Sequence, residues 1–455
     1  MTSDHPSVRA YAEHVNPAFV KLLGVLGYGR LFTKARDVWI WDDAGRVYLD
    51  LLAGFGAVNV GHNHPRLAAR MASFAAEKVP NLIHVGPSEA EAKLAAELSA
   101  LTGDRLPRVL FSSTGAEAVE ASMKLARAAT GRSATVSCEG GFHGTSFGAL
   151  SIMGPARMRK PFEPLLPECR RIPFGDAAAL ERALAPKDVA AFVVEPIQGE
   201  AGVVLPRSDY LPAAASICRA HGTLLVLDEV QTGLARTGKL FAYQHSPMDA
   251  PDVLVLGKSL GGSIAPLSAT LTTREIHDAA YGSMNRFDLH GATFSGNAFA
   301  CAMGSETLGI LRHGHLAERS TARGGQLLEA LRAGLTGHPL VRDVRGQGLM
   351  IAIDLGPTPA TLLGRTLPIV VEMISRQIFG QWIAVSLLER GILCQPASQQ
   401  WNVLKLTPPL TIGEPQIAHA AKTIVALLQD YRTLPPLLKD TVERLGRQAL
   451  GGLRF

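Results

Sequence analysis

The chain has 455 residues, of which 47% are hydrophobic and 19% are charged, with a formal net charge of +5 and a pI near 9.0. This balance is typical of a compact globular enzyme with a large core, and it excludes disordered and fibrous proteins. The lysines and arginines are scattered in short clusters without interleaved aromatic residues, which argues against a nucleic-acid-binding protein.

The N-terminal segment, residues 1–60, is predicted to contain a helix followed by a β-hairpin. Two β-rich runs, 38–41 and 47–52, flank the turn sequence Asp42-Asp43-Ala44-Gly45. Residues 52–62 then carry several glycines, which let a backbone approach a ligand or another chain closely. We expect this segment to pack with a smaller domain at the other end of the chain.

Residues 61–320 alternate between helical and strand patterns and are predicted to form a large domain. The expected helices are 65–77, 89–101 and 117–130, and the expected strands are 109–111, 134–138, 190–194, 224–227 and 253–256. Repeated strand–helix units with short apolar strands predict an α/β fold with a mostly parallel sheet covered by helices on both faces.

Residues 321–432 are predicted to form a smaller α+β domain, with helix near 315–340 and β-like runs at 349–355 and 403–406. Within it, residues 362–388 are rich in large apolar side chains at mixed spacing. We interpret this stretch as a buried helical insert, with a wall for an apolar substrate and a lipid-surface patch as alternatives. The tail, 433–455, is predicted to be either a short amphipathic helix or a loose end.

The five cysteines are widely spaced and form no Cys-x-x-Cys pair. This usage predicts reduced thiols in the cytoplasm and no metal site. The first residues lack the apolar core of a secretory signal, and no run reaches the 18 apolar residues that a membrane span needs.

Chemistry-bearing residues follow two of the predicted strands. The run 224–227 is followed by Asp228, and the run 253–256 is followed by Gly257 and Lys258. Ligands of parallel α/β sheets bind beyond the carboxyl ends of the strands, so the acid and the amine can face one crevice. Such a pair suits pyridoxal phosphate, whose aldehyde forms a Schiff base with a lysine and whose pyridinium nitrogen pairs with an acid. Taken singly, each residue is more often a helix cap or a surface lysine.

Two other segments offer groups that hold anions. Residues 111–117 join a strand to a helix, and free N–H groups with a hydroxyl at a helix N-terminus hold a phosphate. The same segment also reads as a capping box, and the two interpretations are compatible. Thr293 lies just before another predicted helix, in a phosphate-type environment of low specificity.

Aromatic and acidic residues follow two further strands. Phe142 and His143 lie among glycines after the strand 134–138, where a ring can stack on a flat cofactor, although a lone Phe is more often a core residue. Glu195 and Glu200 follow the strand 190–194 and add carboxylates to the same region.

Together these motifs resemble those of class III aminotransferases, which are pyridoxal-phosphate enzymes of the aspartate-aminotransferase fold. The matching segments are STGAEAVEASMKLAR from Ser113, GFHGTSFGALS from Gly141, VEPIQGEAGV from Val194, LDEVQTGLARTGK from Leu227, LGKSLGG from Leu256 and ATFSGNAFAC from Ala292. The resemblance covers roughly residues 15–430. Within it, the run from Gly141 to Gly175, which contains RKPFEPLLPECRRIPFG, is most similar to putrescine and related ω-amine aminotransferases.

The resemblance implies how the cofactor ring is held. Lys258 would bind the cofactor covalently and act as the general base, while Asp228 would hold the ring nitrogen protonated. Gln231 would reach the phenolic oxygen of the ring near Glu195, and Phe142 would stack on one ring face with His143 beside it.

The resemblance also implies how the phosphate is bound. Gly115 and Ala116, flanked by Thr114, would hold it from one chain, and Thr293 would reach it from the partner subunit. A homodimer is then required, because each cofactor needs both chains.

One position departs from the family pattern. Many members carry an arginine before the Pro-Pro-Leu motif that grips a substrate carboxylate, whereas this chain has Lys405, with Glu200 at the position of its glutamate partner. Lysine lacks the planar fork of arginine, so Lys405 is a weaker carboxylate anchor, or the main substrate has no carboxylate there, or Lys405 is a solvated strand residue. Phe55 would lie beside the substrate.

The predicted function is transfer of an amino group from a primary (terminal or ω) amine to an oxo acid by a ping-pong mechanism. The apolar stretch 362–388 favours an amine or aldehyde with a hydrophobic or carrier-bound tail. Alternatives are another reaction of the same cofactor (an aminomutase, racemase or decarboxylase) and a non-catalytic binding subunit, against which the intact Lys258, Asp228 and Gln231 argue.

Overall fold

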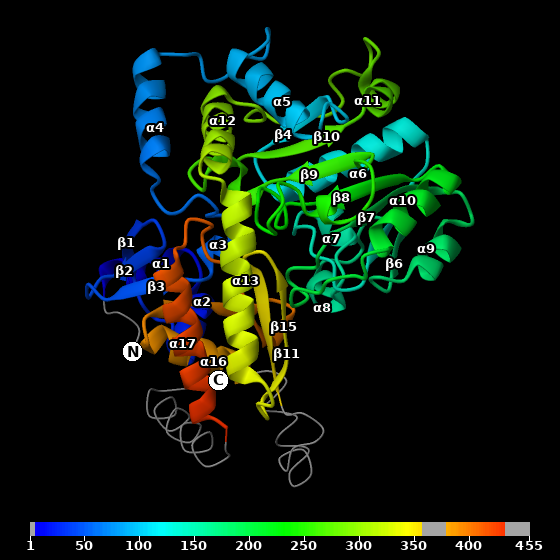
Figure 1. Ribbon diagram of the computed structural model, residues 1–455. Coiled ribbons are helices and arrows are strands. Elements are labelled where there is room, and N and C mark those ends of the chain that lie inside the picture. Colours follow the sequence, from blue (N-terminus) through cyan, green and yellow to red (C-terminus); the bar gives the residue numbers. More distant parts are fainter. Residues whose placement is uncertain (1–4, 357–378, 433–455) are drawn as a thin grey trace.

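The structure, a computed structural model, describes residues 5–356 and 379–432 (Figure 1). The predicted tail and most of the apolar stretch 362–388 lie outside the described residues. The end of that stretch forms helix α16 (Phe379–Glu389), which confirms the helical prediction for this part.

The largest sheet has seven strands. Their order is β4 (Arg108–Ser112), β10 (Ser268–Thr272), β9 (Val253–Leu256), β8 (Leu224–Asp228), β7 (Val189–Val194), β5 (Ala134–Cys138) and β6 (Cys169–Ile172). Only β10 runs antiparallel to its neighbours, so the predicted mostly parallel sheet is confirmed. All strands except β6 and β10 coincide with predicted ones, to within a few residues at each end.

Helices cover both faces of this sheet (Figure 1). Along β8 and β9, successive side chains point to opposite faces of the sheet. Val226 and Val255 pack in one cluster with α6 (Gly115–Thr130), and Leu225 and Leu254 pack in the main core on the other side. Such two-sided burial explains why these strands are apolar throughout. The other helices around this sheet are α5 (Glu89–Leu101), α7 (Phe147–Ser151), α8 (Ala156–Arg159), α9 (Ala177–Leu184), α10 (Tyr210–His221), α11 (Arg274–Tyr281) and α12 (Ala298–His313).

Two smaller sheets combine distant parts of the chain. One has the order β1 (Phe32–Arg36), β2 (Trp39–Asp42), β3 (Val47–Asp50) and β13 (Ile392–Leu393). The other has the order β11 (Val341–Gln347), β12 (Met350–Leu355), β15 (Gln400–Leu406) and β14 (Gln395–Ala397). Because β13 pairs with β3 in parallel, the N-terminal hairpin is joined to the C-terminal part of the chain.

The remaining helices surround these sheets. They are α1 (Pro6–His14), α2 (Pro17–Leu26), α4 (Pro65–Glu77), α13 (Leu316–Leu335) and α17 (Glu414–Asp430), with short 3₁₀ helices at Lys160–Phe162, Ala242–His245 and Lys258–Gly261. The segment α3 (Ala53–Gly56) is a single turn with left-handed backbone angles. The domain boundaries after residues 60, 320 and 432 stay a prediction.

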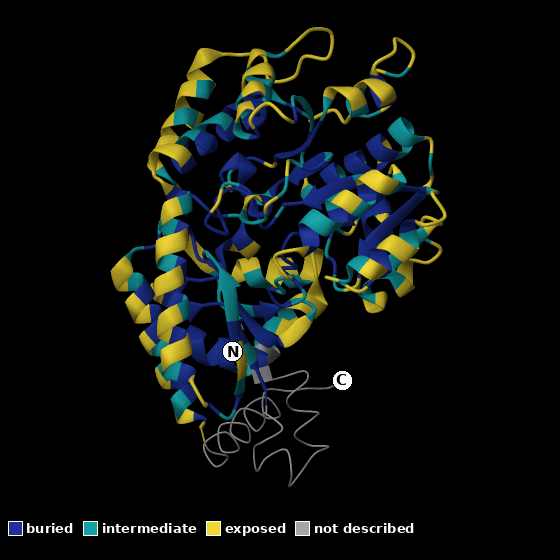
Figure 2. Ribbon diagram, turned by 45° about the vertical axis from the view of Figure 1, so that its right-hand side comes forward, coloured by how far each residue is buried: buried dark blue, intermediate teal, exposed yellow. Residues whose placement is uncertain are grey.

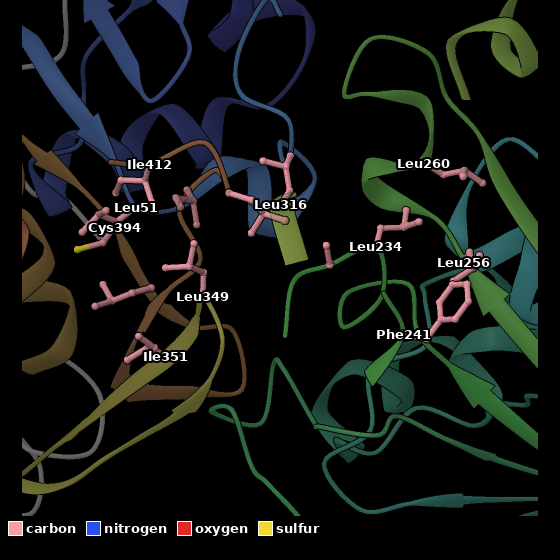
Figure 3. Packing of buried hydrophobic residues seen from close by; sticks show 14 of the residues in the cluster. Leu51, Leu234, Phe241, Leu256, Leu260, Leu316, Leu349, Ile351, Cys394 and Ile412 are labelled. Atoms are coloured by element: carbon pink, nitrogen blue, oxygen red, sulfur yellow. The ribbon is translucent and has the colours of Figure 1, made fainter. Parts of the chain in front are cut away.

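One large hydrophobic core runs through the molecule and links the sheets. Leu51, next to β3, Ile351 on β12 and Cys394, next to β13, belong to the same buried cluster as Leu256 on β9 and Phe241 on the loop after β8 (Figure 3). Exposed residues lie mainly on the outer faces of the helices (Figure 2). This continuous packing fixes the carboxyl ends of β8 and β9 relative to the smaller sheets, and the candidate site lies between them.

Candidate active site

A cavity of about 310 Å³ opens at the carboxyl ends of the parallel strands. Asp228, the last residue of β8, and Lys258, two residues beyond β9, both line it. The two strands are neighbours in the sheet, so the two residues come together although they are thirty positions apart. The full lining consists of Ser113, Thr114, Gly115, Ala116, Phe142, His143, Gly144, Glu195, Glu200, Asp228, Val230, Gln231, Lys258, Pro266 and Leu267.

The N-terminus of α6 forms one wall of the cavity. The Thr114 hydroxyl accepts a hydrogen bond from Glu117 N at 3.2 Å, and the Glu117 carboxylate accepts one from Thr114 N at 3.0 Å, so the predicted capping box is confirmed. The same carboxylate also accepts a hydrogen bond from Ser113 N at 2.8 Å. The N–H groups of Gly115 and Ala116 lie in the first helical turn and have no acceptor within the helix. These two N–H groups at the positive end of a helix suit a phosphate.

Gly115 leaves no room for a side chain at this wall. A Cβ atom added there would lie 2.8 Å from Val230 Cγ1, closer than real Cβ contacts. Only a glycine therefore lets the backbone N–H come this close to the cavity.

His143 supports Asp228 from within the protein. Its Nδ1 lies 2.8 Å from Asp228 Oδ2, and both side chains are buried. Burial disfavours the charged imidazole, but the hydrogen bond and the charge of Asp228 outweigh it and raise the pKa of His143. The Asp228 Oδ1 atom accepts a further hydrogen bond from Val230 N at 3.1 Å. These contacts fix the position of the carboxylate.

Lys258 has two features of a reactive amine. Its φ is +46°, a left-handed conformation that costs a non-glycine residue about 1–2 kcal/mol and that is concentrated at functional sites. Burial, together with the nearby Lys405, lowers the pKa of its amine to about 8. A larger neutral fraction near pH 7 makes the amine a better nucleophile and base than an ordinary lysine.

Glu195 positions the aromatic ring of the cavity. Its Oε1 accepts a hydrogen bond from Phe142 N at 2.9 Å, and its Oε2 accepts one from Gly199 N at 3.2 Å. Burial, with the charge of Asp228 nearby, raises the pKa of Glu195 to about 7, although His143 partly offsets this rise.

The neighbouring acid, Glu229, faces away from the cavity. It accepts hydrogen bonds from Ala242 N at 2.6 Å and Tyr243 N at 2.8 Å, and from the Thr232 hydroxyl at 3.3 Å. Of the two adjacent carboxylates at the end of β8, only Asp228 belongs to the site, while Glu229 holds the following loop.

Glu200 and Gln231 line another wall of the cavity, and Lys405 and Phe55 contact these two residues from outside the lining. Lys405 is fully buried on β15 and is paired with the Glu200 carboxylate, so its interpretation as a solvated strand residue is wrong. Burial opposes ionisation, but the ammonium groups of Lys405 and Lys258 lower the pKa of Glu200 to about 2. Gln231 Nε2 donates to Phe55 O at 2.9 Å and to Glu200 Oε1 at 3.2 Å.

The remaining predicted residues lie outside the cavity lining. Phe55 and Lys405 reach the site through Glu200 and Gln231, and Thr293 lies on an exposed segment. Sequence reasoning missed Pro266 and Leu267 as lining residues. They directly precede β10, whose sequence SATLT lacks the apolar run that reveals the other strands.

Comparison with known proteins agrees with this geometry. Residues 27–428 match the family model of the class-III aminotransferases. The chain belongs to the class-III aminotransferase family. Members of this family depend on pyridoxal phosphate, so pyridoxal 5'-phosphate is the cofactor that the site has to accommodate.

Individual relatives of the chain are also aminotransferases. The chain is 32% identical over 458 residues to aminotransferase PigE of Serratia sp. (strain ATCC 39006), spanning 93% of this chain but only 53% of that protein, about half its length. The structure of ornithine aminotransferase from Toxoplasma gondii ME49 superposes with a TM-score of 0.79 at 30% identity, covering 93% of this chain and 98% of that chain. An amine transaminase from an uncultivated Pseudomonas species, solved with its cofactor bound, superposes with a TM-score of 0.77 at 29% identity, covering 88% and 94%.

The cavity fits this cofactor on its own chemistry. The glycine-lined helix N-terminus suits the phosphate, Phe142 offers a ring to stack on, and Lys258 supplies an amine for the aldehyde. Asp228 supplies a buried carboxylate for the ring nitrogen, with His143 holding it in place.

Proposed function

We propose that the chain transfers an amino group from a primary amine to an oxo acid in two half-reactions at one site, that is, by a ping-pong mechanism. The convergence of Lys258, Asp228 and the helix N-terminus on one cavity carries this proposal. When bound, pyridoxal phosphate withdraws the electron pair that is released when the substrate carbon loses its proton.

The residues of this chain divide the work among them. Once a substrate amine has displaced Lys258, the freed Lys258 amine moves the proton at the substrate carbon. The lowered pKa of the Lys258 amine suits this role as a base. Asp228, with His143 behind it, keeps the ring nitrogen protonated and is the largest electrostatic contribution. Thr114, Gly115 and Ala116 hold the phosphate, with Thr293 reaching it from a second chain.

The preferred substrate is an amine or aldehyde with an apolar or carrier-bound tail. No arginine lines the cavity among the residues that the structure describes. The cation nearest to the expected carboxylate position, Lys405, is neutralised by Glu200. A free amino acid with a second charged group finds little to bind it there.

We place a second copy of the chain against the segments 79–85 and 284–294. These segments expose large apolar side chains: Val79, Leu82, Ile83, Val85, Met284, Phe287, Leu289 and Phe294. Asn81 fixes the first segment to the start of α12, since its carbonyl accepts from Ala298 N at 3.0 Å and its side chain from Phe299 N at 2.9 Å. Covering this surface by a second copy favours a homodimer and lets Thr293 reach the neighbouring site.

We also place the enzyme in the cytoplasm. All five cysteines are free thiols, which suits a reducing compartment. Separately, none of the helices within residues 5–356 and 379–432 has the length and apolar character of a membrane span.

A donor panel tests the proposed function. Purified protein loaded with pyridoxal phosphate is given pentylamine, putrescine or ornithine, with pyruvate or 2-oxoglutarate as acceptor. We expect amino transfer with parallel-line kinetics and higher kcat/KM for pentylamine than for ornithine. Absence of transfer from any amine by the loaded protein would refute the aminotransferase proposal, and a strong preference for ornithine would refute the proposed substrate class.

A further inference from the structure

Three arginines lie around the start of β6, on the face of the large sheet that α6 covers. Cys169 and Arg171 are two residues apart on this strand, so they point to the same face. Cys169 packs against the buried cluster that includes Ala126 of α6, which identifies that face. Arg127 lies in the last turn of α6, and Arg159 is the last residue of α8. We call Arg127, Arg159 and Arg171 the arginine cluster.

The charges of all three guanidinium groups reach the Cys169 thiol. Burial raises the pKa of this thiol, and the charges of Arg127, Arg171 and Arg159 each oppose that rise. Two of the arginines also affect each other, since burial and the nearby charge of Arg159 lower the pKa of Arg171. Like charges are therefore gathered in a partly buried place, where their repulsion is unfavourable.

No acidic side chain balances these charges directly. In the described part of the chain, no carboxylate forms an ion pair with any arginine of the cluster. Arg170, by contrast, points to the other face of β6 and is paired with Asp188. Glu168, whose charge also reaches the Cys169 thiol, is an exposed residue. The cluster thus keeps an excess of positive charge that its neighbour Arg170 does not have.

Several N–H groups of the cluster have no acceptor. Arg127 Nε, Arg127 Nη2 and Arg159 Nε are buried and make no hydrogen bond within the described residues. The hydrogen bonds that the cluster does form go to backbone carbonyls, those of Ser151, Gly154 and Cys169. Buried donors normally have partners, so these N–H groups indicate a ligand that carries acceptor atoms.

We propose that the arginine cluster binds a phosphate group, either as the free ion or as part of a small ester. A phosphate group carries up to two negative charges on several acceptor oxygens, and the planar fork of arginine binds it in a bidentate manner. Its charge offsets the repulsion within the cluster, and its oxygens accept from the unpartnered N–H groups of Arg127 and Arg159. A carboxylate brings less charge and fewer oxygens.

This site is separate from the cofactor site. Arg127 lies twelve residues beyond Gly115 on α6, which is about 18 Å along the helix. The inference therefore does not depend on the proposed function. Holoenzyme is the material for the test, because its cofactor already fills the phosphate position at Gly115.

Calorimetry with inorganic phosphate at constant ionic strength tests the proposal. We expect the wild-type protein to bind phosphate, with an affinity that falls at least about tenfold in Arg127→Gln and in Arg171→Gln, because each variant removes charge-assisted hydrogen bonds. Arg170→Gln is the matched control, since it removes an adjacent arginine that faces away, and it should keep the wild-type affinity. The proposal fails if the wild-type protein binds no phosphate, or if neither Arg127→Gln nor Arg171→Gln binds it more weakly than the control.

Alkylation of Cys169 locates the bound phosphate. Of the five cysteines, all of which the structure describes, Cys169 alone is not buried. Its reaction with iodoacetamide in holoenzyme is followed by peptide mass spectrometry. Phosphate at ten times its Kd should slow this reaction about tenfold in the wild-type protein and in Arg170→Gln, but not at the same concentration in Arg127→Gln. An unchanged rate in the wild-type protein at saturating phosphate would place the bound ion elsewhere and overturn the proposal.

Glycerol phosphate distinguishes the two sources of the phosphate group. Weaker binding of glycerol phosphate than of inorganic phosphate identifies the free ion as the ligand, and equal or tighter binding identifies an ester. Either order supports the site. Chloride that protects Cys169 at the same concentration as phosphate contradicts it, because the cluster would then not select a phosphate group.

Discussion

The two walls of the cavity are built in different ways. The cofactor half consists of Thr114, Gly115, Ala116, Phe142, Asp228 and Lys258, and each of them lies within a few residues of the end of a strand in the large sheet. The substrate half consists of Phe55, Glu200 and Lys405, which come from an N-terminal turn, a loop and a strand of a smaller sheet. Gln231, three residues after β8, donates hydrogen bonds to Phe55 O and Glu200 Oε1.

This difference separates chemistry from selectivity. The cofactor half depends on local features, a strand end and a helix N-terminus, whose positions the parallel sheet fixes. The substrate half depends on contacts between segments more than 140 residues apart, such as Phe55 with Gln231. Changes in the cofactor half should therefore abolish the reaction or weaken cofactor binding, while changes in the substrate half should alter which substrates react.

The largest expected effect is that of Lys258→Ala. Removing both the covalent attachment point and the base should lower kcat by at least about 10³-fold. Steady-state turnover and the absorbance of the bound cofactor measure the loss. Lys239→Ala, at an exposed lysine on the loop after β8, is the control and should keep full activity. Substantial turnover by Lys258→Ala would assign the base role to another group.

The adjacent acids at the end of β8 allow a sharper comparison. Asp228→Asn keeps the size of the side chain but removes its charge, and should lower kcat by about 10²–10³-fold because the ring nitrogen is no longer held protonated. Glu229→Gln should instead lower the free energy of unfolding by about 1–3 kcal/mol, since it disturbs the acceptor of three hydrogen bonds. Kinetics and denaturant unfolding of both variants test this. A large loss of kcat in Glu229→Gln, with little loss of kcat in Asp228→Asn, would contradict it.

A smaller effect is expected for Gly115→Ala. The added Cβ would lie 2.8 Å from Val230 Cγ1, so the helix N-terminus has to shift away from the phosphate. We expect the affinity for pyridoxal phosphate to fall about tenfold, as measured by titration of cofactor-free protein. Gly325→Ala, whose Cβ would meet no atom within 4 Å, is the control. Equal affinities of the two variants would show that this helix N-terminus does not set cofactor binding.

The pH dependence of cofactor capture gives the smallest expected change. Only the neutral Lys258 amine attacks the aldehyde, and burial lowers its pKa to about 8. The capture rate of cofactor-free protein should therefore rise with pH, by about tenfold per unit well below pH 8, and level off above it. Stopped-flow absorbance follows the rate. A rate that keeps rising up to pH 10 would show that the amine titrates like an ordinary lysine.

The sequence allowed most of the large sheet and the cofactor half to be predicted. Apolar runs mark strands that are buried on both faces, and Asp228 and Lys258 follow such runs directly. The strand β10 was missed because its serine and threonine side chains donate hydrogen bonds to backbone carbonyls, such as Thr270 to Ala118 O at 2.8 Å. The contacts of Phe55 and Lys405 arise from long-range packing, which leaves no periodic pattern in the sequence.

The position of the covalent bond to the cofactor tests the central claim most directly. Holoenzyme is reduced with borohydride, which makes that bond permanent, then digested and analysed by peptide mass spectrometry. We expect the phosphopyridoxyl group on Lys258 alone. In the Asp228→Asn variant, the labelling of Lys258 should not exceed the wild-type level. A label on Lys405 or Lys239, or no label on any lysine of a protein saturated with pyridoxal phosphate, would contradict the assignment of the site.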